Sequence, residues 1–290
     1  MVLKSRSILP VWYAESRFLH SAAIREIVDS ADSFVFGRMF KTPTNSTYRD
    51  GNHILLTFCH LEYPWDCNGV LSDPPTNLAS IVAATYNYEE ATQQAIPRCI
   101  IDCTLKESSS TKRIIEEFKA EGFSSTAPME DKVMRLLVTE KWKQNQVQPS
   151  YTVRLARMAD LDQLVECNAS SFGYPVDGQQ WIKAKLQRQL ESRLFSIYVV
   201  DVEGEIAAFV VLYEWVERAR DLAWVQVIGT KPNFRHQGLA SALLSYAIGL
   251  LAVGTKVYLE AEDQVALALY EKIGFEHVGT IVSVECLLSK

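Results

Sequence analysis

Residues 229–241 read Gly-Thr-Lys-Pro-Asn-Phe-Arg-His-Gln-Gly-Leu-Ala-Ser, and this stretch decides the fold. The residues before it, 222–228, are apolar, β-branched or aromatic, which predicts a strand. The residues after it, 239–251, carry apolar side chains at helical spacing, which predicts a helix. The stretch is therefore a turn from a strand into a helix.

Such a turn is a natural site for an anion. The first N–H groups of a helix have no partner within it, and the helix dipole places partial positive charge there. Gly238 lacks the side chain that would block close approach. The alternative is that Gly238 only relaxes a tight turn before a buried helix.

With its flanks, the turn resembles motif A of the GNAT N-acetyltransferase superfamily. That motif has Arg or Gln, two residues, Gly, one residue, then Gly or Ala, with Pro three residues before the first position. Pro232, Arg235, Gly238 and Ala240 fit it. The resemblance implies that the turn binds the pyrophosphate of an acyl-CoA.

A second family element is expected further along the chain: a strand, an Asn-containing turn, and a helix ending in Tyr-x-Lys-x-Gly-Phe. Residues 257–275 match it, at Ala266, Leu269, Tyr270, Lys272, Gly274 and Phe275. Asp263 departs from the pattern, because the family usually has Asn there. A carboxylate cannot donate the hydrogen bond of an amide and would repel a polyanionic cofactor, so weaker CoA binding is expected.

Composition narrows the class of protein. The 290 residues are 48% hydrophobic and 22% charged, as in a soluble globular protein with two cores. A net charge of −6 argues against a general nucleic-acid binder. No stretch approaches the length of a membrane span and the first residues lack a signal sequence, so a cytoplasmic or nucleocytoplasmic protein with no membrane partner is expected.

A metal site is not expected. The six cysteines lack the paired short spacings of a zinc site, and the five histidines show no ligand pattern. Buried free thiols are the expected state of the cysteines.

The second half of the chain predicts a mixed α/β sheet. Strands are expected at 151–157, 195–201, 206–215, 222–228 and 281–288, and a further strand is expected to pass through Tyr258. A turn is expected at Glu203 and Gly204. Helices are expected at 160–172, 177–191, 239–251 and 263–273. This order is that of the GNAT acyl-CoA N-acyltransferase fold, so residues 151–290 are expected to form the catalytic domain.

Residues 141–150 are polar and contain Pro149, and are interpreted as a linker. In residues 1–140, helices are expected at 22–31 and 110–121 and strands at 54–59, 81–86, 97–105 and 132–137. Residues 114–123 parallel the Tyr-Glu-Lys-Ile-Gly-Phe ending, which favours a second, degenerate GNAT-like domain that lost its phosphate turn. An unrelated α/β cap domain is the alternative.

The resemblance assigns a set of cofactor residues. Backbone amides of the turn would hold the pyrophosphate, Arg235 would add charge, and the end of the preceding strand would pair with the pantetheine arm. The residues concerned are Ile228, Gly229, Thr230, Arg235, His236, Gln237, Gly238, Leu239, Ala240 and Ser241, with Asp263 nearby.

Acyl transfer also needs an acid and a base. Tyr270 matches the family's helix tyrosine, which donates a proton to the departing thiolate; alternatively it only packs against the sheet. For the base, Glu260 or Glu214 acting through water is a candidate, although each is also typical of a solvated surface charge.

The sequence therefore predicts an acetyl-CoA-dependent N-acetyltransferase acting on a primary amine of a small molecule or on an exposed amino group. A non-catalytic acyl-CoA-binding or sensing protein is the alternative, and an interaction scaffold ranks last. The sequence patterns do not specify the oligomeric state or the identity of the acceptor.

Overall fold

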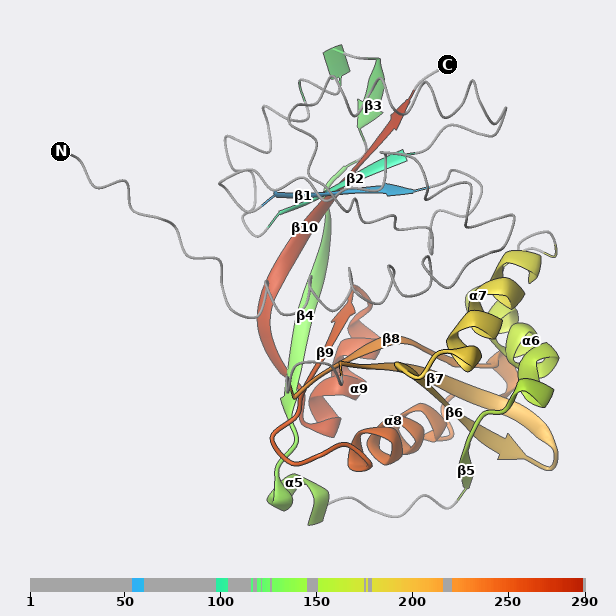
Figure 1. Ribbon diagram of the computed structural model, residues 1–290. Helices are drawn as coiled ribbons and strands as arrows, with labels where there is room; N and C mark the ends of the chain where they lie inside the picture. Colours follow the sequence, from blue (N-terminus) through green and yellow to red (C-terminus); the bar gives the residue numbers. More distant parts are fainter. Residues whose placement is uncertain are drawn as a thin grey trace. The chain divides into compact units, whose positions relative to one another are not determined.

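The computed structural model describes residues 54–59, 98–103, 116, 119–120, 122–125, 127–144, 151–174, 176, 179–215 and 221–288. Figure 1 shows its strands and helices. They are β1 (Ile54–Cys59), β2 (Arg98–Cys103), β3 (Phe123–Ser125), β4 (Met129–Leu137), α5 (Glu140–Gln144), β5 (Thr152–Leu155), α6 (Leu161–Phe172), α7 (Gln179–Glu191), β6 (Phe195–Val202), β7 (Glu205–Trp215), β8 (Leu222–Thr230), α8 (Leu239–Gly249), β9 (Lys256–Ala261), α9 (Gln264–Ile273) and β10 (Glu276–Leu288).

The order predicted for the second half is confirmed, because β5 to β10 and α6 to α9 follow one another as expected. The strands expected at 54–59 and 97–105 are also present as β1 and β2. Of the helix expected at 110–121, residues 116, 119 and 120 are described, and all three are helical. The helix expected at 22–31 and the strand at 81–86 lie outside the described residues.

The chain divides into two compact units. One comprises residues 133–278 with 15–30, and the other comprises 1–14, 31–132 and 279–290. The long segment of the larger unit begins at residue 133, before the domain borders expected from sequence at 140 and 150, and ends at residue 278, before the expected end of the second domain at 290. The assignment of 1–140 and 151–290 as separate domains therefore stays a prediction.

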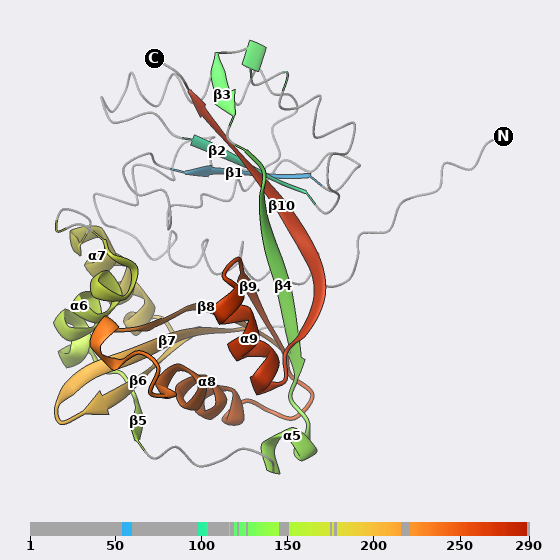
Figure 2. The same cartoon turned by 180° about the vertical axis from the view of Figure 1, so that it is seen from behind.

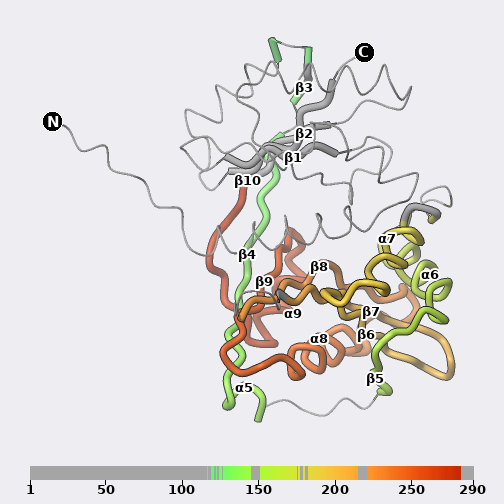
Figure 3. Tube along the Cα trace, viewed as in Figure 1, coloured from blue at the N-terminus to red at the C-terminus, as the bar shows by residue number. Residues whose placement is uncertain are grey.

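In the larger unit, the strand order from one side of the sheet is β4-β9-β8-β7-β6-β5. The pairs β5–β6, β6–β7 and β7–β8 are antiparallel, whereas β8–β9 is parallel. A parallel pair needs a crossover connection, and α8 supplies it (Figure 3). The mixed sheet predicted from sequence is confirmed.

Helices cover both faces of this sheet. Val210 and Leu212 of β7 lie in one buried cluster with Leu243 and Leu244 of α8, and residues of α9 join that cluster. Figure 2 shows α8 and α9 alongside the strands of this sheet. Side chains alternate between faces along a strand, so Phe209 of β7 faces the other way, where α6 contacts the sheet.

The strand predicted at 132–137 lies within β4 and contributes to the core of the larger unit. Met134, Leu136 and Val138 are buried in the cluster that contains α8 and α9. The local pattern of apolar residues predicts the strand correctly, but the position of the strand in a sheet depends on contacts with residues far away in sequence.

In the smaller unit, β2 lies between two antiparallel neighbours. Cys103 of β2 lies opposite Ile54 of β1 on one side and opposite Val282 of β10 on the other. Strand β10 also pairs with β3. The last strand predicted for the catalytic domain therefore ends in this unit.

The predicted linker is partly helical. Residues Glu140–Gln144 form α5, and the indole N–H of Trp142 donates to the carbonyl of Ile273, at 2.9 Å. This contact joins α5 to the end of α9. Residues 145–150 lie outside the described part of the chain.

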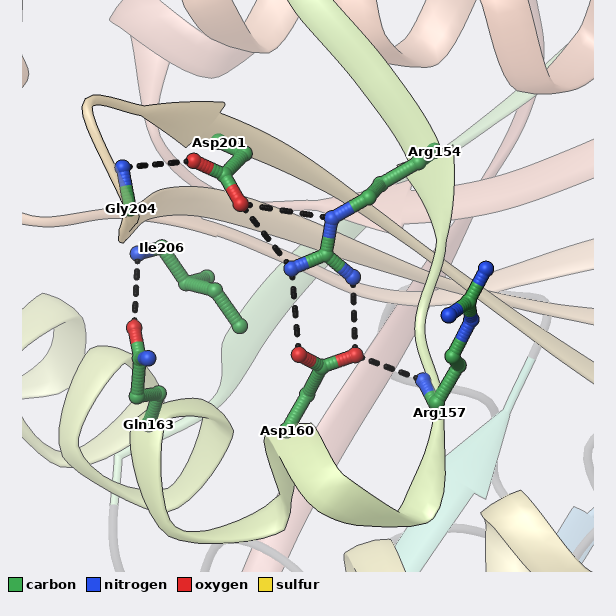
Figure 4. A network of polar contacts seen from close by, with 7 residues as sticks. All are labelled: Arg154, Arg157, Asp160, Gln163, Asp201, Gly204 and Ile206. Atoms are coloured by element: carbon green, nitrogen blue, oxygen red, sulfur yellow. Dashed lines mark hydrogen bonds and ion pairs between the residues drawn. The ribbon is translucent and has the colours of Figure 1, made fainter.

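An ion-pair network holds β5, α6 and the β6–β7 hairpin together (Figure 4). Arg154 donates to both oxygens of Asp160, at 2.8 and 3.0 Å, and to Asp201 at 3.0 Å. The bidentate Arg154 guanidinium lowers the pKa of Asp160 below 3.8 despite partial burial. Asp201 also accepts from the amide of Gly204, in the hairpin turn.

The hairpin turn has the predicted residues and a matching backbone. Glu203 and Gly204 have φ values of 54° and 89°, and Val202 pairs with Glu205 across them. Two consecutive left-handed residues are typical of a tight two-residue turn between antiparallel strands.

Within the described residues, no helix is both long and apolar enough to cross a membrane. Cys167 is a free, fully buried cysteine on α6, as expected, and burial raises the pKa of its thiol to about 11.

Candidate functional site

The turn between β8 and α8 has the backbone of an anion site. Gly238 precedes the first residue of α8, has φ of +79°, and would have no atom within 4 Å of an added Cβ. The amide of Ala242 donates to the carbonyl of Gly238 at 3.0 Å. The amides of Leu239, Ala240 and Ser241 precede this first helical bond and therefore have no helical acceptor.

Two residues of the turn adopt left-handed backbone. His236 has φ of +62°, which is uncommon for a residue other than glycine, and Gly238 follows two positions later. The carbonyl of Gln237, between them, accepts from the hydroxyl of Tyr151 at 3.1 Å. The turn is thus held from outside itself by a residue next to β5.

Arg235 contacts protein backbone in this structure. Its guanidinium donates to the carbonyl of Ser171 at 2.7 Å and to that of Thr230 at 3.3 Å. It thereby links the end of α6 to the end of β8. Its expected contribution to phosphate binding stays a prediction.

The end of β8 is closely packed. A Cβ added to Gly229 would lie 2.6 Å from Cε1 of Phe209 and 3.0 Å from Cβ of Ser171. Since real side chains do not approach so closely, the position has room only for glycine. This packing role was not expected from sequence, where Gly229 was assigned to the cofactor through its backbone.

Strand β8 contains a bulge, and it pairs with its parallel neighbour β9 only along its first part. Val225 pairs with Leu212 and Val227 with Val211, so Gln226 is the extra residue. Pairing with β9 is recorded from Leu222 to Trp224, although β8 continues to Thr230. The backbone of Ile228 to Thr230 is the part expected to meet a pantetheine arm, and that role remains a prediction.

Tyr270 lies on α9 with its ring buried. It is 7% exposed and packs edge-on against Phe275, with ring centroids 5.9 Å apart. Burial, and to a smaller extent the carboxylate of Asp263, raise the pKa of Tyr270 to about 12. The phenol is therefore protonated at neutral pH and is a hydrogen-bond donor.

Asp263 has a structural role that the sequence comparison did not anticipate. It precedes α9, and its side chain accepts from the amide of Val265 at 2.9 Å. Asp and Asn are equally good at this capping position, so the departure from the family's Asn preserves the helix start. The weaker CoA binding expected from its carboxylate stays a prediction.

The two candidate bases occupy different ends of the sheet. Glu214 lies opposite Ala223, at the start of β8, whereas Thr230 at its end lies opposite Ala208. Six residues of strand separate these positions along β7, or about 20 Å. Glu214 also accepts from the hydroxyl of Ser196 at 3.0 Å, so the structure does not bring it to the turn.

Glu260 is better placed than Glu214. It lies on β9 two residues beyond Tyr258, which pairs with Trp224, and is half-buried. Because β8 and β9 are parallel, Glu260 lies toward the same end of the sheet as Thr230.

Sequence reasoning missed a buried ion-pair cluster at the start of the turn. Lys231 is 6% exposed, and its Nζ lies 2.8 Å from both Glu166 of α6 and Glu205 of β7. Lys231 directly follows β8, and its amide donates to Ala207 of β7 at 2.9 Å. A lysine between Thr and Pro gave no sign that it was buried.

A second missed contact lies at the bulge. Gln189 of α7 is fully buried, and its amide group donates to the side chain of Gln226. A polar contact in an apolar layer has no periodic signal in the sequence.

In the described part of the chain, no three His, Cys, Asp or Glu side chains form a group able to hold a metal ion.

Comparisons with known proteins agree with this arrangement. Residues 193–277 match the sequence profile of the acetyltransferase (GNAT) domain. A putative ribosomal protein bS18 alanine N-acetyltransferase from Bacillus subtilis is 30% identical over 132 residues, which are 44% of this chain and 82% of that protein.

Two further similarities differ in what they cover. A mycothiol acetyltransferase from Clavibacter michiganensis is 29% identical over 131 residues, and the chain spans 42% of that relative's length. A solved structure of a protein of unknown function from Staphylococcus epidermidis has a TM-score of 0.58 and 12% identity, over 84% of this chain and 95% of that one. The last similarity concerns the fold alone.

Proposed function

This chain belongs to the GNAT acetyltransferase family, and we propose that it transfers an acetyl group from acetyl-CoA to a primary amine. The observation that carries the proposal is the turn at Gly238, which has left-handed backbone and leads directly into α8, whose first amides have no helical acceptors. An anionic cofactor suits such a turn, because backbone amides bind phosphate oxygens without a cationic pocket.

The cofactor assignment follows from this turn. The amides from His236 to Ser241 hold the pyrophosphate, and the end of β8, beyond its last recorded pair with β9, meets the pantetheine arm. Acetyl-CoA is here a substrate, and it supplies the thioester that is broken.

The reaction is direct attack. The neutral amine nitrogen bonds to the thioester carbonyl carbon, the carbon–sulfur bond breaks, the attacking nitrogen loses one proton, and the CoA sulfur gains one. Tyr270 is our candidate donor to the sulfur, because its buried phenol is protonated at neutral pH. With a pKa of about 12 it stabilises a thiolate through a hydrogen bond more readily than it transfers its proton completely.

For the base we propose Glu260, acting through water, in preference to Glu214. The parallel register places Glu260 toward the end of β8 that carries the turn, whereas Glu214 lies about 20 Å away along β7 and accepts from Ser196. An amine is mostly protonated at neutral pH, so it must lose a proton before it attacks.

The acceptor is proposed as a class only. One relative is named for the alanine of a ribosomal protein and another for mycothiol, so an exposed amino group and a small-molecule amine are both candidates. The alternative function is acyl-CoA binding without turnover.

The test is an assay of CoA thiol release from acetyl-CoA with three amines: a peptide beginning with alanine, a polyamine and an amino sugar. Turnover with one of them is expected, and Tyr270→Phe should lower kcat about 100-fold with little change in KM for acetyl-CoA. Tyr246→Phe is the matched control, because Tyr246 lies on α8 against Tyr198 and outside the turn. Binding of acetyl-CoA with no turnover, together with a Kd for acetyl-CoA that Tyr270→Phe leaves unchanged, would favour the alternative of acyl-CoA binding without catalysis.

A further inference from the structure

The peptide between Gln237 and Gly238 has two sterically possible orientations. Turning it over changes ψ of Gln237 and φ of Gly238, and glycine accepts either sign of φ. The observed φ of +79° at Gly238 therefore does not by itself keep the peptide in place. Something outside the residue must select the orientation.

Orientation decides whether the turn attracts or repels an anion. In a planar trans peptide, the carbonyl and the following N–H point in opposite directions. If the Gln237 carbonyl turned toward the cofactor, a partial negative charge would face the pyrophosphate and the Gly238 amide would be lost as a donor. The backbone matters especially here, because the Arg235 guanidinium donates to the carbonyls of Ser171 and Thr230.

The hydroxyl of Tyr151 fixes the carbonyl. It donates to the Gln237 oxygen at 3.1 Å, from a residue that directly precedes β5 and lies 86 positions away in sequence. The half-buried Tyr151 ring packs against the core cluster that includes residues of α8, so contacts outside the turn set its position. The side chain of Gln237 folds back to the Asn233 carbonyl at 3.3 Å and leaves the backbone carbonyl to Tyr151.

We propose that Tyr151 is a positioning residue for the cofactor site: its hydrogen bond holds the Gln237 carbonyl away from the pyrophosphate and so aims the Gly238 amide at it. The proposal rests on the proposed function, because it concerns the same acetyl-CoA site. Nothing in the family's motifs includes this residue, which lies outside residues 193–277.

The test is calorimetric titration of the full chain with two ligands. CoA carries the pyrophosphate, whereas S-acetylpantetheine carries the arm and the thioester but no phosphate. Tyr151→Phe keeps the ring and removes the hydroxyl, and should raise the Kd for CoA about fivefold, as expected for one net hydrogen bond. The Kd for S-acetylpantetheine should stay unchanged, and Tyr246→Phe should change neither.

Three results would overturn the proposal, and they differ in what else they reject. An unchanged Kd for CoA in Tyr151→Phe would reject the positioning role alone. Equal weakening of both ligands would show a general change in the protein and would also reject it. Failure of the folded wild-type chain to bind CoA would reject the positioning role together with the proposed function.

Discussion

The Nζ atom of Lys231 lies 2.8 Å from a carboxylate oxygen of Glu166, so the residue that directly follows β8 is bound to α6. It makes an equally short contact with Glu205 at the start of β7. The lysine is buried and the carboxylates are half or more exposed, and together they connect α6 and β7 to the start of the segment between β8 and α8.

Lys231→Met should therefore destabilise the protein. Removal of a buried cation from two carboxylates leaves them close to one another, but their exposure screens the repulsion, so a loss of about 1–2 kcal/mol is expected. Lys183→Met is the matched control, since Lys183 and Asp162 form an exposed pair at 2.6 Å, and should change the free energy of unfolding by less than about 0.5 kcal/mol. Urea unfolding at pH 7 measures both, and equal effects would contradict the account.

The contribution of Lys231 should also depend on pH. Burial alone would lower the pKa of Lys231, but the hydrogen bonds to Glu166 and Glu205 outweigh it and raise the pKa above 10.5. A raised pKa stabilises the fold fully below the unfolded value and loses that effect as the pH rises through the folded one. The stability difference between wild type and Lys231→Met should thus be constant from pH 7 to 9 and shrink above about pH 10.4.

Gly229→Ala should be destabilising because there is no space for a methyl group. Its Cβ would lie 2.6 Å from Phe209, and a loss of about 1–3 kcal/mol is expected from overpacking. Gly249→Ala, at a helical position with no atom within 4 Å of the added Cβ, should be neutral or stabilising. Thermal unfolding of the two variants provides the comparison, and a neutral Gly229→Ala would show that β8 and α6 are less closely packed than described.

Two substitutions of Asp263 distinguish its role as the cap of α9 from an effect of its charge on cofactor binding. Asp263→Asn retains the cap to Val265 and should leave stability unchanged, whereas Asp263→Ala should cost about 1 kcal/mol. If the carboxylate weakens cofactor binding, Asp263→Asn should also lower the Kd for CoA. An unchanged Kd would place Asp263 outside the cofactor site and leave it only its role in α9.

The elements of residues 151–290 were predictable because their signals are local. Apolar periodicity, the turn at Glu203 and Gly204, and the glycine before α8 each act within a few residues, and each has its expected structure. Gly238 precedes α8 and Tyr270 lies on α9, as the local patterns predict, and the roles assigned to these two residues stay predictions.

What was missed depends on distant partners. Lys231 meets Glu166 from 65 residues away, and Tyr151 reaches Gln237 across 86 residues. The strand at 132–137 was recognised, but its place in the sheet was not, because strand pairing is chosen by the whole core. Burial of a polar residue leaves no periodic trace in a sequence.

Calorimetric titration of CoA into three forms of the chain tests most directly whether the turn at Gly238 binds the pyrophosphate of CoA. Wild type should bind. Gly238→Glu should lose at least about 100-fold in affinity, because its carboxylate would occupy and repel the anion site. Gly254→Glu controls for backbone strain, since Gly254 has φ of +96° and an equally open position between α8 and β9, and it should bind as wild type does. Equal binding by Gly238→Glu and wild type, or no binding by the folded wild-type chain, would contradict the account.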